Sequence, residues 1–228
     1  MDFEEFVLAA SLTDLDDEIR AREHADAVEF RMDLAAEFAD SDSLAALRAY
    51  DGELPVIATN RASWESGEAE DDESRLADLA GAAELACVGA VDVELRSLTQ
   101  GEGDRVAAHA RQTDTAVIAS VHDFEGTPPK PDLRGELEEA TDRADVGKLA
   151  VTAEDRGDVL DLLTVTHEFA EAGARVATMA MGEPGRHSRA VAPLYGSAIG
   201  YAPIDPEDAT APGQYDLETL SRLVDQLR

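Results

Sequence analysis

The sequence contains a single cysteine, Cys87, and therefore cannot form a disulfide within the chain. Because disulfides are rare in reducing compartments and this chain has none, we expect a cytoplasmic protein. No apolar run approaches the roughly 18 residues that a membrane span requires, and the acidic start, MDFEEF, differs from the basic start of a signal peptide. The histidines and the cysteine show no spacing typical of a metal site, so we expect no bound metal.

Lysine is scarce as well. Of the 19 cationic residues, 17 are arginines, and only Lys130 and Lys148 are lysines, against 50 acidic residues and a formal net charge of −31. Such a charge repels phosphate backbones and anionic lipids, which argues against a nucleic-acid or membrane-surface partner. An acidic, lysine-poor surface is typical of proteins from a salt-saturated cytoplasm, where screening weakens self-repulsion. We therefore expect an extreme halophile as the source and greater stability in molar salt.

The chain does contain an alternation of short apolar runs with longer, alanine-rich stretches of helical period. Hydrophobic residues make up 44% of it, enough for a packed core. Eight strand-and-helix pairs predict an α/β fold, a closed (β/α)8 TIM barrel that forms one domain over residues 1–228. An open doubly wound sheet is the alternative, but no G-x-G-x-x-G motif follows the first run. The expected strands are 6–11, 27–33, 55–61, 90–96, 115–123, 146–151, 175–181 and 198–203, and the expected helices are 14–24, 42–50, 72–87, 102–113, 133–143, 155–172, 186–193 and 216–227.

Charged residues occupy alternate positions of several expected strands. Glu29, Arg31 and Asp33 share one side of the second strand, and Asp92 and Glu94 share one side of the fourth. Because side chains on barrel strands alternate between the interior and the helix layer, we expect these groups to face the interior. Buried charges must neutralise one another or meet a polar ligand. A set of purely structural ion pairs is one interpretation, but charges at the C-terminal ends of several strands favour a catalytic cleft.

Lys148 lies in the apolar run VGKLAV, where desolvation and nearby cations would favour the neutral amine. A neutral amine inside a barrel is a nucleophile for a carbonyl substrate, through a Schiff base. The alternative is a lysine that reaches solvent from the end of a strand. His122, on the adjacent strand, is the nearest candidate to move protons for such chemistry. The segment MGEPGRHSR (181–189), with Ser188 and Arg189, has the composition of an anion-binding loop for a phosphate or a carboxylate, or of a plain turn.

Taken together, these residues resemble the type I 3-dehydroquinate dehydratase family from about Ser11 to Gln214. The motifs that carry the resemblance are Glu29-Phe-Arg31-Met-Asp33, Arg61 with Glu65 four residues later, Ser-Val-His122-Asp-Phe followed by Thr-Pro, Gly-Lys148-Leu-Ala-Val, Met-Gly-x-x-Gly-x-x-Ser-Arg189, Tyr-Gly-Ser and Ala-Pro-Gly-Gln214. Two positions depart from the family pattern: Thr210 stands where serine is usual, and Ala180 stands where serine is common.

The resemblance implies a TIM barrel that converts 3-dehydroquinate to 3-dehydroshikimate in the shikimate pathway, without a cofactor and as a homodimer. Lys148 would form the Schiff base with the C3 ketone, His122 would act as general base and acid, and Glu65 would orient its imidazole. Arg189 would bind the substrate carboxylate, which a guanidinium matches in shape. The other positions implied to bind the substrate are Ser11, Glu29, Arg31, Arg61, Thr210 and Gln214, the last from a closing loop.

Two other functions stay open on the sequence. The first is another Schiff-base barrel lyase, of the aldolase or transaldolase type, acting on a phosphosugar; it accounts for Lys148 and the loop 181–189 but not for the Ala-Pro-Gly-Gln motif. The second is a non-catalytic acidic binding protein whose internal charges are structural.

Overall fold

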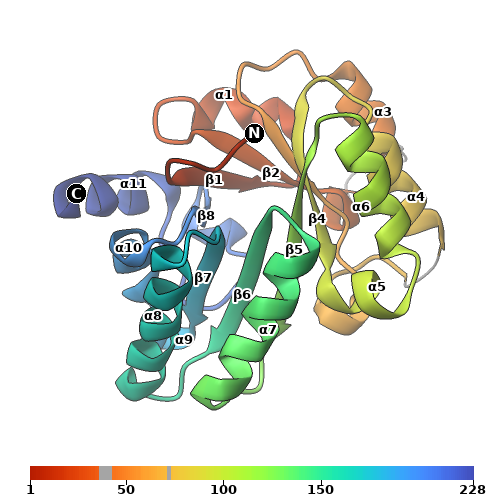
Figure 1. The fold of residues 1–228 in the computed structure, drawn as a ribbon. Helices are drawn as coiled ribbons and strands as arrows, with labels where there is room; N and C mark the ends of the chain where they lie inside the picture. Colours follow the sequence, from red (N-terminus) through yellow and green to blue (C-terminus); the bar gives the residue numbers. More distant parts are fainter. Residues whose placement is uncertain (36–42, 71–72) are drawn as a thin grey trace.

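The computed structural model describes residues 1–35, 43–70 and 73–228. Eight parallel strands follow one another in the order β7-β6-β5-β4-β3-β2-β1-β8. Between β7 and β8 the ring is closed by a bridge of Val176 to Ser197, where the Ala198 N–H donates to the Val176 carbonyl at 2.7 Å. The (β/α)8 barrel predicted from the sequence is therefore confirmed (Figure 1). The strands are β1 (Val7–Leu12), β2 (Ala27–Arg31), β3 (Val56–Thr59), β4 (Val88–Glu94), β5 (Ala116–Asp123), β6 (Val146–Thr152), β7 (Val176–Met181) and β8 (Ile199–Pro203).

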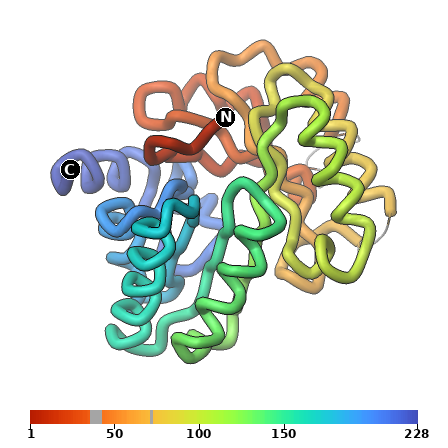
Figure 2. The backbone as a smooth tube through the Cα atoms, in the orientation of Figure 1, coloured from red at the N-terminus to blue at the C-terminus, as the bar shows by residue number. Residues whose placement is uncertain are grey.

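Helices cover the outside of the ring, and the tube in Figure 2 brings the last strand back beside the first, with which it pairs. The helices are α1 (Glu18–Ala21), α2 (Met32–Ala35), α3 (Ser43–Ala49), α4 (Glu73–Ala82), α5 (Leu95–Gln100), α6 (Gly103–Gln112), α7 (Lys130–Arg143), α8 (Arg156–Glu171), α9 (Gly182–Gly185), α10 (Ser188–Val191) and α11 (Leu217–Leu227). Four short 3-10 segments are η1 (Leu15–Asp17), η2 (Ser63–Glu65), η3 (Ala192–Tyr195) and η4 (Pro206–Asp208). Within the described ranges, no helix is long and apolar enough to cross a membrane.

Alternation along the strands separates the interior of the ring from its helix-covered face. The outward side chains of β2 and β4, such as Val28, Phe30 and Val91, join the cluster that packs under the helices. The inward side chains are small or apolar in the N-terminal half of the barrel and polar towards the C-terminal ends. The apolar interior layer is formed by Phe3, Ala9, Ala27, Ile57, Ala90, Ile118, Val146, Ala177 and Ile199. This layer closes the floor of the barrel, so the polar ends of the strands are left to form a site.

Three expected strands end two residues earlier than predicted, and one of them is β3, which stops at Thr59 and not at Arg61. β2 stops at Arg31 and β4 at Glu94, and the short helices α2 and α5 begin directly after them. Asp33 was expected to face the barrel interior, but it lies in α2, where it is buried. Residues 42 and 72, the predicted first residues of two helices, lie outside the described ranges, while α3 and α4 confirm most of the segments that follow them.

The expected helix 133–143 begins three residues earlier than predicted, because Lys130 begins α7. Pro131 sits in the first turn of this helix, where the missing N–H removes no hydrogen bond. The Lys130 ammonium forms an ion pair with Asp161 of α8 at 2.7 Å. This lysine is partly exposed and pairs with the neighbouring helix on the outside of the barrel.

Candidate active site

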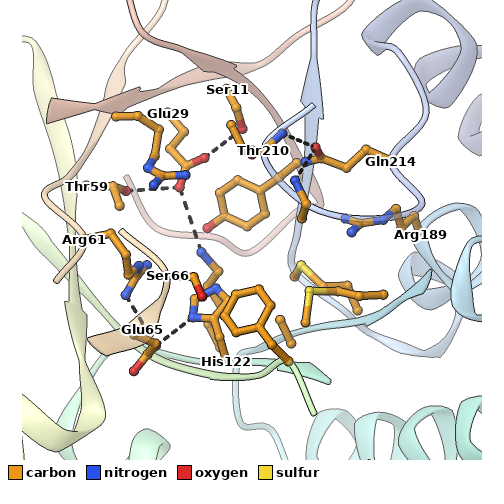
Figure 3. A pocket seen from close by; sticks show the side chains of 18 residues that line it. Ser11, Glu29, Thr59, Arg61, Glu65, Ser66, His122, Arg189, Thr210 and Gln214 are labelled. Carbon is orange, nitrogen blue, oxygen red and sulfur yellow. Dashed lines mark hydrogen bonds and ion pairs between the residues drawn. The ribbon is translucent and has the colours of Figure 1, made fainter. Parts of the chain in front are cut away.

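One pocket at the C-terminal ends of the strands brings together the ten side chains predicted to be catalytic or to bind the substrate. All ten line it, and Figure 3 shows most of them converging from several strands and from the last loop. They are Ser11, Glu29, Arg31, Arg61, Glu65, His122, Lys148, Arg189, Thr210 and Gln214. The pocket also has lining residues that were not predicted: Thr59, Ser66, Phe124, Ala150, Met179, Met181, Tyr201 and Ala211.

Lys148 lies in β6 with its side chain buried in the barrel interior. Its Nζ atom is 2.9 Å from Oδ2 of Asp92 on β4 and 3.9 Å from Oε1 of Glu29 on β2. Its nearest charged neighbours are therefore carboxylates, and the closest described cation of this network, Arg61, lies on the other side of Asp92. The amine is ion-paired in the resting site, and it must give up a proton before it attacks a carbonyl.

Asp92 connects Lys148 to the next cation of the site. It accepts hydrogen bonds from Arg61 at 2.8 Å and from Ser120 at 2.6 Å, and Arg61 also donates to Ser120 at 2.6 Å. Burial alone would raise the pKa of Asp92, but the adjacent Arg61 and Lys148 outweigh it and hold this pKa below its usual value. Asp92 is thus a permanent anion between two cations, and Arg61 is fixed by protein groups on several sides.

His122 of β5 forms a pair with Glu65 of η2, with its Nδ1 atom 2.7 Å from Oε1 of the carboxyl group. Burial, together with Arg61 and Lys148, lowers the pKa of His122 well below its usual value. Burial raises the pKa of Glu65 to about 8. The pair therefore loses one of its two protons near pH 8, and the other stays shared between Nδ1 and Oε1. Above that pH, Nδ1–H donates to the Glu65 carboxylate and the Nε2 lone pair is free to act as a base.

The register places His122 and Lys148 on the same inner face of the barrel. Ser120 is opposite Lys148 across the β5–β6 pair, and His122, two residues further along β5, is opposite Ala150. Because side chains two residues apart point to the same side, His122 lies one step closer to the mouth than Lys148. The imidazole also stacks on Phe124, with ring centroids 5.9 Å apart, which restricts its orientation.

Arg75, which the sequence did not single out, fixes the loop that carries Glu65. This fully buried arginine of α4 donates to Oε2 of Glu94 at 2.8 Å and to the Asn60 carbonyl at 2.9 Å. The other oxygen of Glu94 accepts the Ala62 N–H at 2.9 Å. No motif in the helical stretch identified this residue, because its role depends on which loop the helix covers.

Arg189 of α10 has no ion-pair partner among the residues that the structure describes. Its side chain is buried, and its recorded hydrogen bond goes to the Pro212 carbonyl at 3.3 Å. Burial lowers the pKa of Arg189 to about 10, which leaves it charged at neutral pH. A buried guanidinium without a carboxylate partner is the arrangement that binds an anionic ligand. Ser188, expected to help, instead bonds the backbone of Ala180 and does not line the pocket.

Glu29 and Arg31, at the end of β2, are held by different partners. The Glu29 carboxylate accepts hydrogen bonds from Ser11 at 2.7 Å and from Thr59 at 3.1 Å. Arg31 donates two hydrogen bonds to Asp33, at 2.9 and 2.7 Å. Asp33 therefore acts on the site from outside the barrel interior, by fixing the arginine that lines the pocket.

The loop 210–214 covers the pocket, and hydrogen bonds of its backbone hold it in place. Gln214 accepts the N–H groups of Thr210 and Ala211 at 2.9 and 3.1 Å, and the Gly182 N–H donates to the Pro212 carbonyl at 3.2 Å. Gly213 has a φ of +77°, and a Cβ there would lie 2.6 Å from the Gly182 carbonyl oxygen, so only glycine fits. The Ala-Pro-Gly-Gln motif thus shapes this loop as well as lining the pocket.

Comparison with known proteins assigns this arrangement to a family. The family model described as type I 3-dehydroquinase matches residues 6–228. The chain belongs to this family. The 3-dehydroquinate dehydratases of Halobacterium salinarum and Haloarcula marismortui are each 53% identical to it, over 100% of this chain and 100% and 99% of theirs. The crystal structure of 3-dehydroquinate dehydratase from Geobacillus kaustophilus HTA426 is similar with a TM-score of 0.86, at 28% identity, over 98% of this chain and 91% of that chain.

The resemblance noted in the sequence is therefore confirmed, and the most similar relatives named above come from halophilic archaea. Of the two departures from the 3-dehydroquinase pattern, Thr210 lines the pocket. Ala180 does not: it packs on the helix-facing side of β7, while its neighbours Met179 and Met181 face the pocket. The missing hydroxyl at position 180 consequently removes no pocket contact. No cluster of three or more metal-ligating side chains occurs within the described ranges.

Proposed function

We propose that this 3-dehydroquinase dehydrates 3-dehydroquinate to 3-dehydroshikimate through an imine on Lys148. The observation that carries the proposal is the convergence of three groups on one pocket: a buried amine, a histidine–carboxyl pair one step above it, and a buried arginine that no described carboxylate pairs with. The names of the relatives support the overall reaction, and the geometry supports the assignment of the steps.

The first step is the attack of the Lys148 amine on the C3 ketone. The amine first passes a proton to Nε2 of His122. Its lone pair then forms the C–N bond, the carbonyl π electrons move to oxygen, and a proton moves from the nitrogen to that oxygen to give a carbinolamine. His122 returns its proton to the carbinolamine hydroxyl group, which leaves as water, and the nitrogen lone pair forms the protonated imine. Asp92 lies 2.9 Å from Nζ, so its carboxylate stabilises the cationic nitrogen both before the attack and in the imine.

The second step is the removal of a proton from C2 by Nε2 of His122. The C–H electrons form a double bond between C2 and C3, and the imine nitrogen accepts the displaced pair. The enamine then expels the C1 hydroxyl group, which leaves as water with the proton that His122 carries. Water finally attacks the new imine and releases 3-dehydroshikimate from Lys148. Glu65 keeps Nδ1 hydrogen-bonded throughout, which directs Nε2 to the substrate.

Substrate binding is assigned to the remaining lining groups. Arg189 binds the carboxylate, because it is the buried cation of the pocket that no described carboxylate neutralises. Ser11, Glu29 and Arg31 offer polar contacts to ring hydroxyls from one side, and Thr210 and Gln214 do so from the covering loop. Arg61 contributes mainly by organising the charged floor, since its guanidinium already bonds Asp92 and Ser120.

Borohydride trapping tests the proposal with an internal control, because the sequence contains two lysines. The protein incubated with 3-dehydroquinate and borohydride should gain one reduced adduct, which peptide mass spectrometry should locate at Lys148. Lys148→Met should abolish both the adduct and the rise in enone absorbance of the product. Lys130→Arg, on the outside of the barrel, should leave both intact. An adduct on Lys130, an adduct that persists in Lys148→Met, or turnover of phosphosugars in place of 3-dehydroquinate would contradict the proposal.

We also propose that the active form is a single-domain homodimer in the cytoplasm. Family likeness supports the dimer, and the presence of a single cysteine supports a reducing compartment. Light scattering coupled to size exclusion in molar KCl should give a mass close to twice the 24.3 kDa of the chain. A mass of one chain would contradict the dimer without affecting the chemistry.

A further inference from the structure

Tyr201 lies in β8 with its ring inside the barrel, directly beside the reactive amine. Its side chain is almost completely buried and lines the same pocket as Lys148 and Glu29. The Lys148 Nζ atom lies 4.2 Å from the centroid of the tyrosine ring. At this distance the ring face attracts the ammonium, so the aromatic ring already contributes to holding the amine in place.

The hydroxyl group of Tyr201 is not explained by that contact. It is buried and has no hydrogen-bond partner among the residues that the structure describes. Neighbouring hydroxyls of the barrel interior are paired: Ser11 and Thr59 with Glu29, and Ser120 with Asp92. A buried hydroxyl without a partner is costly, and phenylalanine would fill the same volume without that cost. The hydroxyl is therefore a buried polar group without a described partner, on a ring that lines the pocket.

The surroundings make this hydroxyl a donor and not a base. Burial raises the pKa of Tyr201 well above its usual value, and the negative charges of Glu29 and Asp92 raise it further. The proton consequently stays on the oxygen. The two carboxylates bond other donors, and no described residue accepts this proton, so a ligand in the pocket is the acceptor that the site offers it.

We propose that the Tyr201 hydroxyl donates a hydrogen bond to an oxygen atom of the bound substrate, at or next to the carbon that Lys148 attacks. The carbon that bonds to Nζ must come close to the amine, and hence to the ring beneath it. Its own oxygen and those of the adjacent carbons are the substrate acceptors nearest to this ring. Tyr201 is then a substrate-contacting residue of the dehydration, beyond the groups assigned above, and the inference rests on the proposed function.

Tyr201→Phe tests the inference because it removes the hydroxyl and keeps the ring over which Lys148 lies. Loss of one neutral hydrogen bond to the substrate should lower kcat/KM about 2- to 12-fold. The melting temperature of the ligand-free protein should stay equal or rise, because the hydroxyl has no hydrogen bond to a described residue that could be lost. The matched control is Tyr50→Phe. Tyr50 donates to the Leu54 carbonyl at 2.7 Å outside the pocket, so this variant should melt lower and keep its kcat/KM.

The outcomes separate the inference from the function on which it rests. An unchanged kcat/KM in Tyr201→Phe overturns the inference, and so does a lowered melting temperature in the ligand-free variant, which would assign the hydroxyl a structural role. Both results are informative only when the wild type turns over 3-dehydroquinate and is trapped at Lys148. If the wild type does neither, the proposed function fails first, whatever the variant does.

Discussion

The substitution Asp92→Asn is the most direct test of the buried charge network. Asp92 lies between two cations, with Arg61 at 2.8 Å and Lys148 at 2.9 Å, and it also accepts the Ser120 hydroxyl at 2.6 Å. Asparagine has the same shape but no charge. The variant therefore leaves the packing in place and removes the anion that faces the Lys148 ammonium and the Arg61 guanidinium.

The expected loss of stability follows from the charges that remain. Removing one partner of a buried ion pair costs about 3–5 kcal/mol, since the other charge is left buried without compensation. Arg61 keeps Glu94 at 3.4 Å and Glu65 at 3.6 Å, and Lys148 keeps Glu29 at 3.9 Å. These longer contacts place the expected loss at the lower end, about 3 kcal/mol. For a chain of this size that corresponds to a fall in melting temperature of about 6–12 °C.

Denaturant unfolding of the ligand-free protein at constant salt measures this loss, with Asp225→Asn on the exposed face of α11 as the control. The control should stay within about 0.5 kcal/mol of the wild type. Adding Lys148→Met to Asp92→Asn removes one uncompensated cation and should restore part of the stability. A loss below about 1 kcal/mol in Asp92→Asn, or a further loss in the double variant, would refute the reasoning.

The stability that Asp92→Asn removes depends on pH, and it should decrease in acid. Because the pKa of Asp92 is lower in the folded protein than its ordinary value of 3.8, its contribution is complete above that value and is lost as the pH falls through the folded pKa. Protonated Asp92 resembles asparagine. The difference in stability between wild type and variant should therefore be constant near neutral pH and shrink in acid.

Three further predictions follow from the site and the composition. In the wild type, kcat/KM should rise with pH near pH 8, because the pKa of the Glu65 carboxyl group is raised to about 8. Glu65→Gln removes this group, so the rise should move to lower pH. Identical pH profiles would contradict the pairing of Glu65 with His122. Arg189→Ala should raise KM for 3-dehydroquinate about 10- to 100-fold and alter kcat less, and an unchanged KM would place the carboxylate elsewhere. The melting temperature of the wild type should rise between 0.1 and 2 M KCl, and a flat response would contradict the screening argument.

Alternation along the strands was sufficient to predict where the site lies. Once eight strands were assigned, the polar positions of β2, β4, β5 and β6 had to share the interior face, and the C-terminal ends of parallel strands had to meet. Lys148, His122 and Glu29 could therefore be placed in one cleft from their parity alone. Tyr201 is two residues from Ile199 in β8 and therefore points to the same side. The alternation rule applied to β8 would thus also have placed Tyr201 inside the barrel.

Other features depend on contacts that a linear pattern does not contain. The pairing of Lys148 with Asp92 joins residues 56 positions apart, and strand parity places both inside the barrel without predicting which carboxylate the amine meets. The ends of β2 and β4 were missed because a charged residue that continues the alternation also suits the first turn of a short helix. Arg75 was missed because the loop that it fixes is set by the packing of α4.

The charges inside the barrel are arranged differently from those of the chain as a whole. The surface carries most of an acidic excess of −31, whereas the interior pairs its cations and anions closely, as between Lys148, Asp92 and Arg61. Arg189 is the buried cation without a carboxylate among the described residues. An anionic substrate thus meets a repulsive exterior, which salt screens over a few ångströms, and then one desolvated guanidinium, which salt screens much less. The acidic surface and a carboxylate substrate are compatible for this reason.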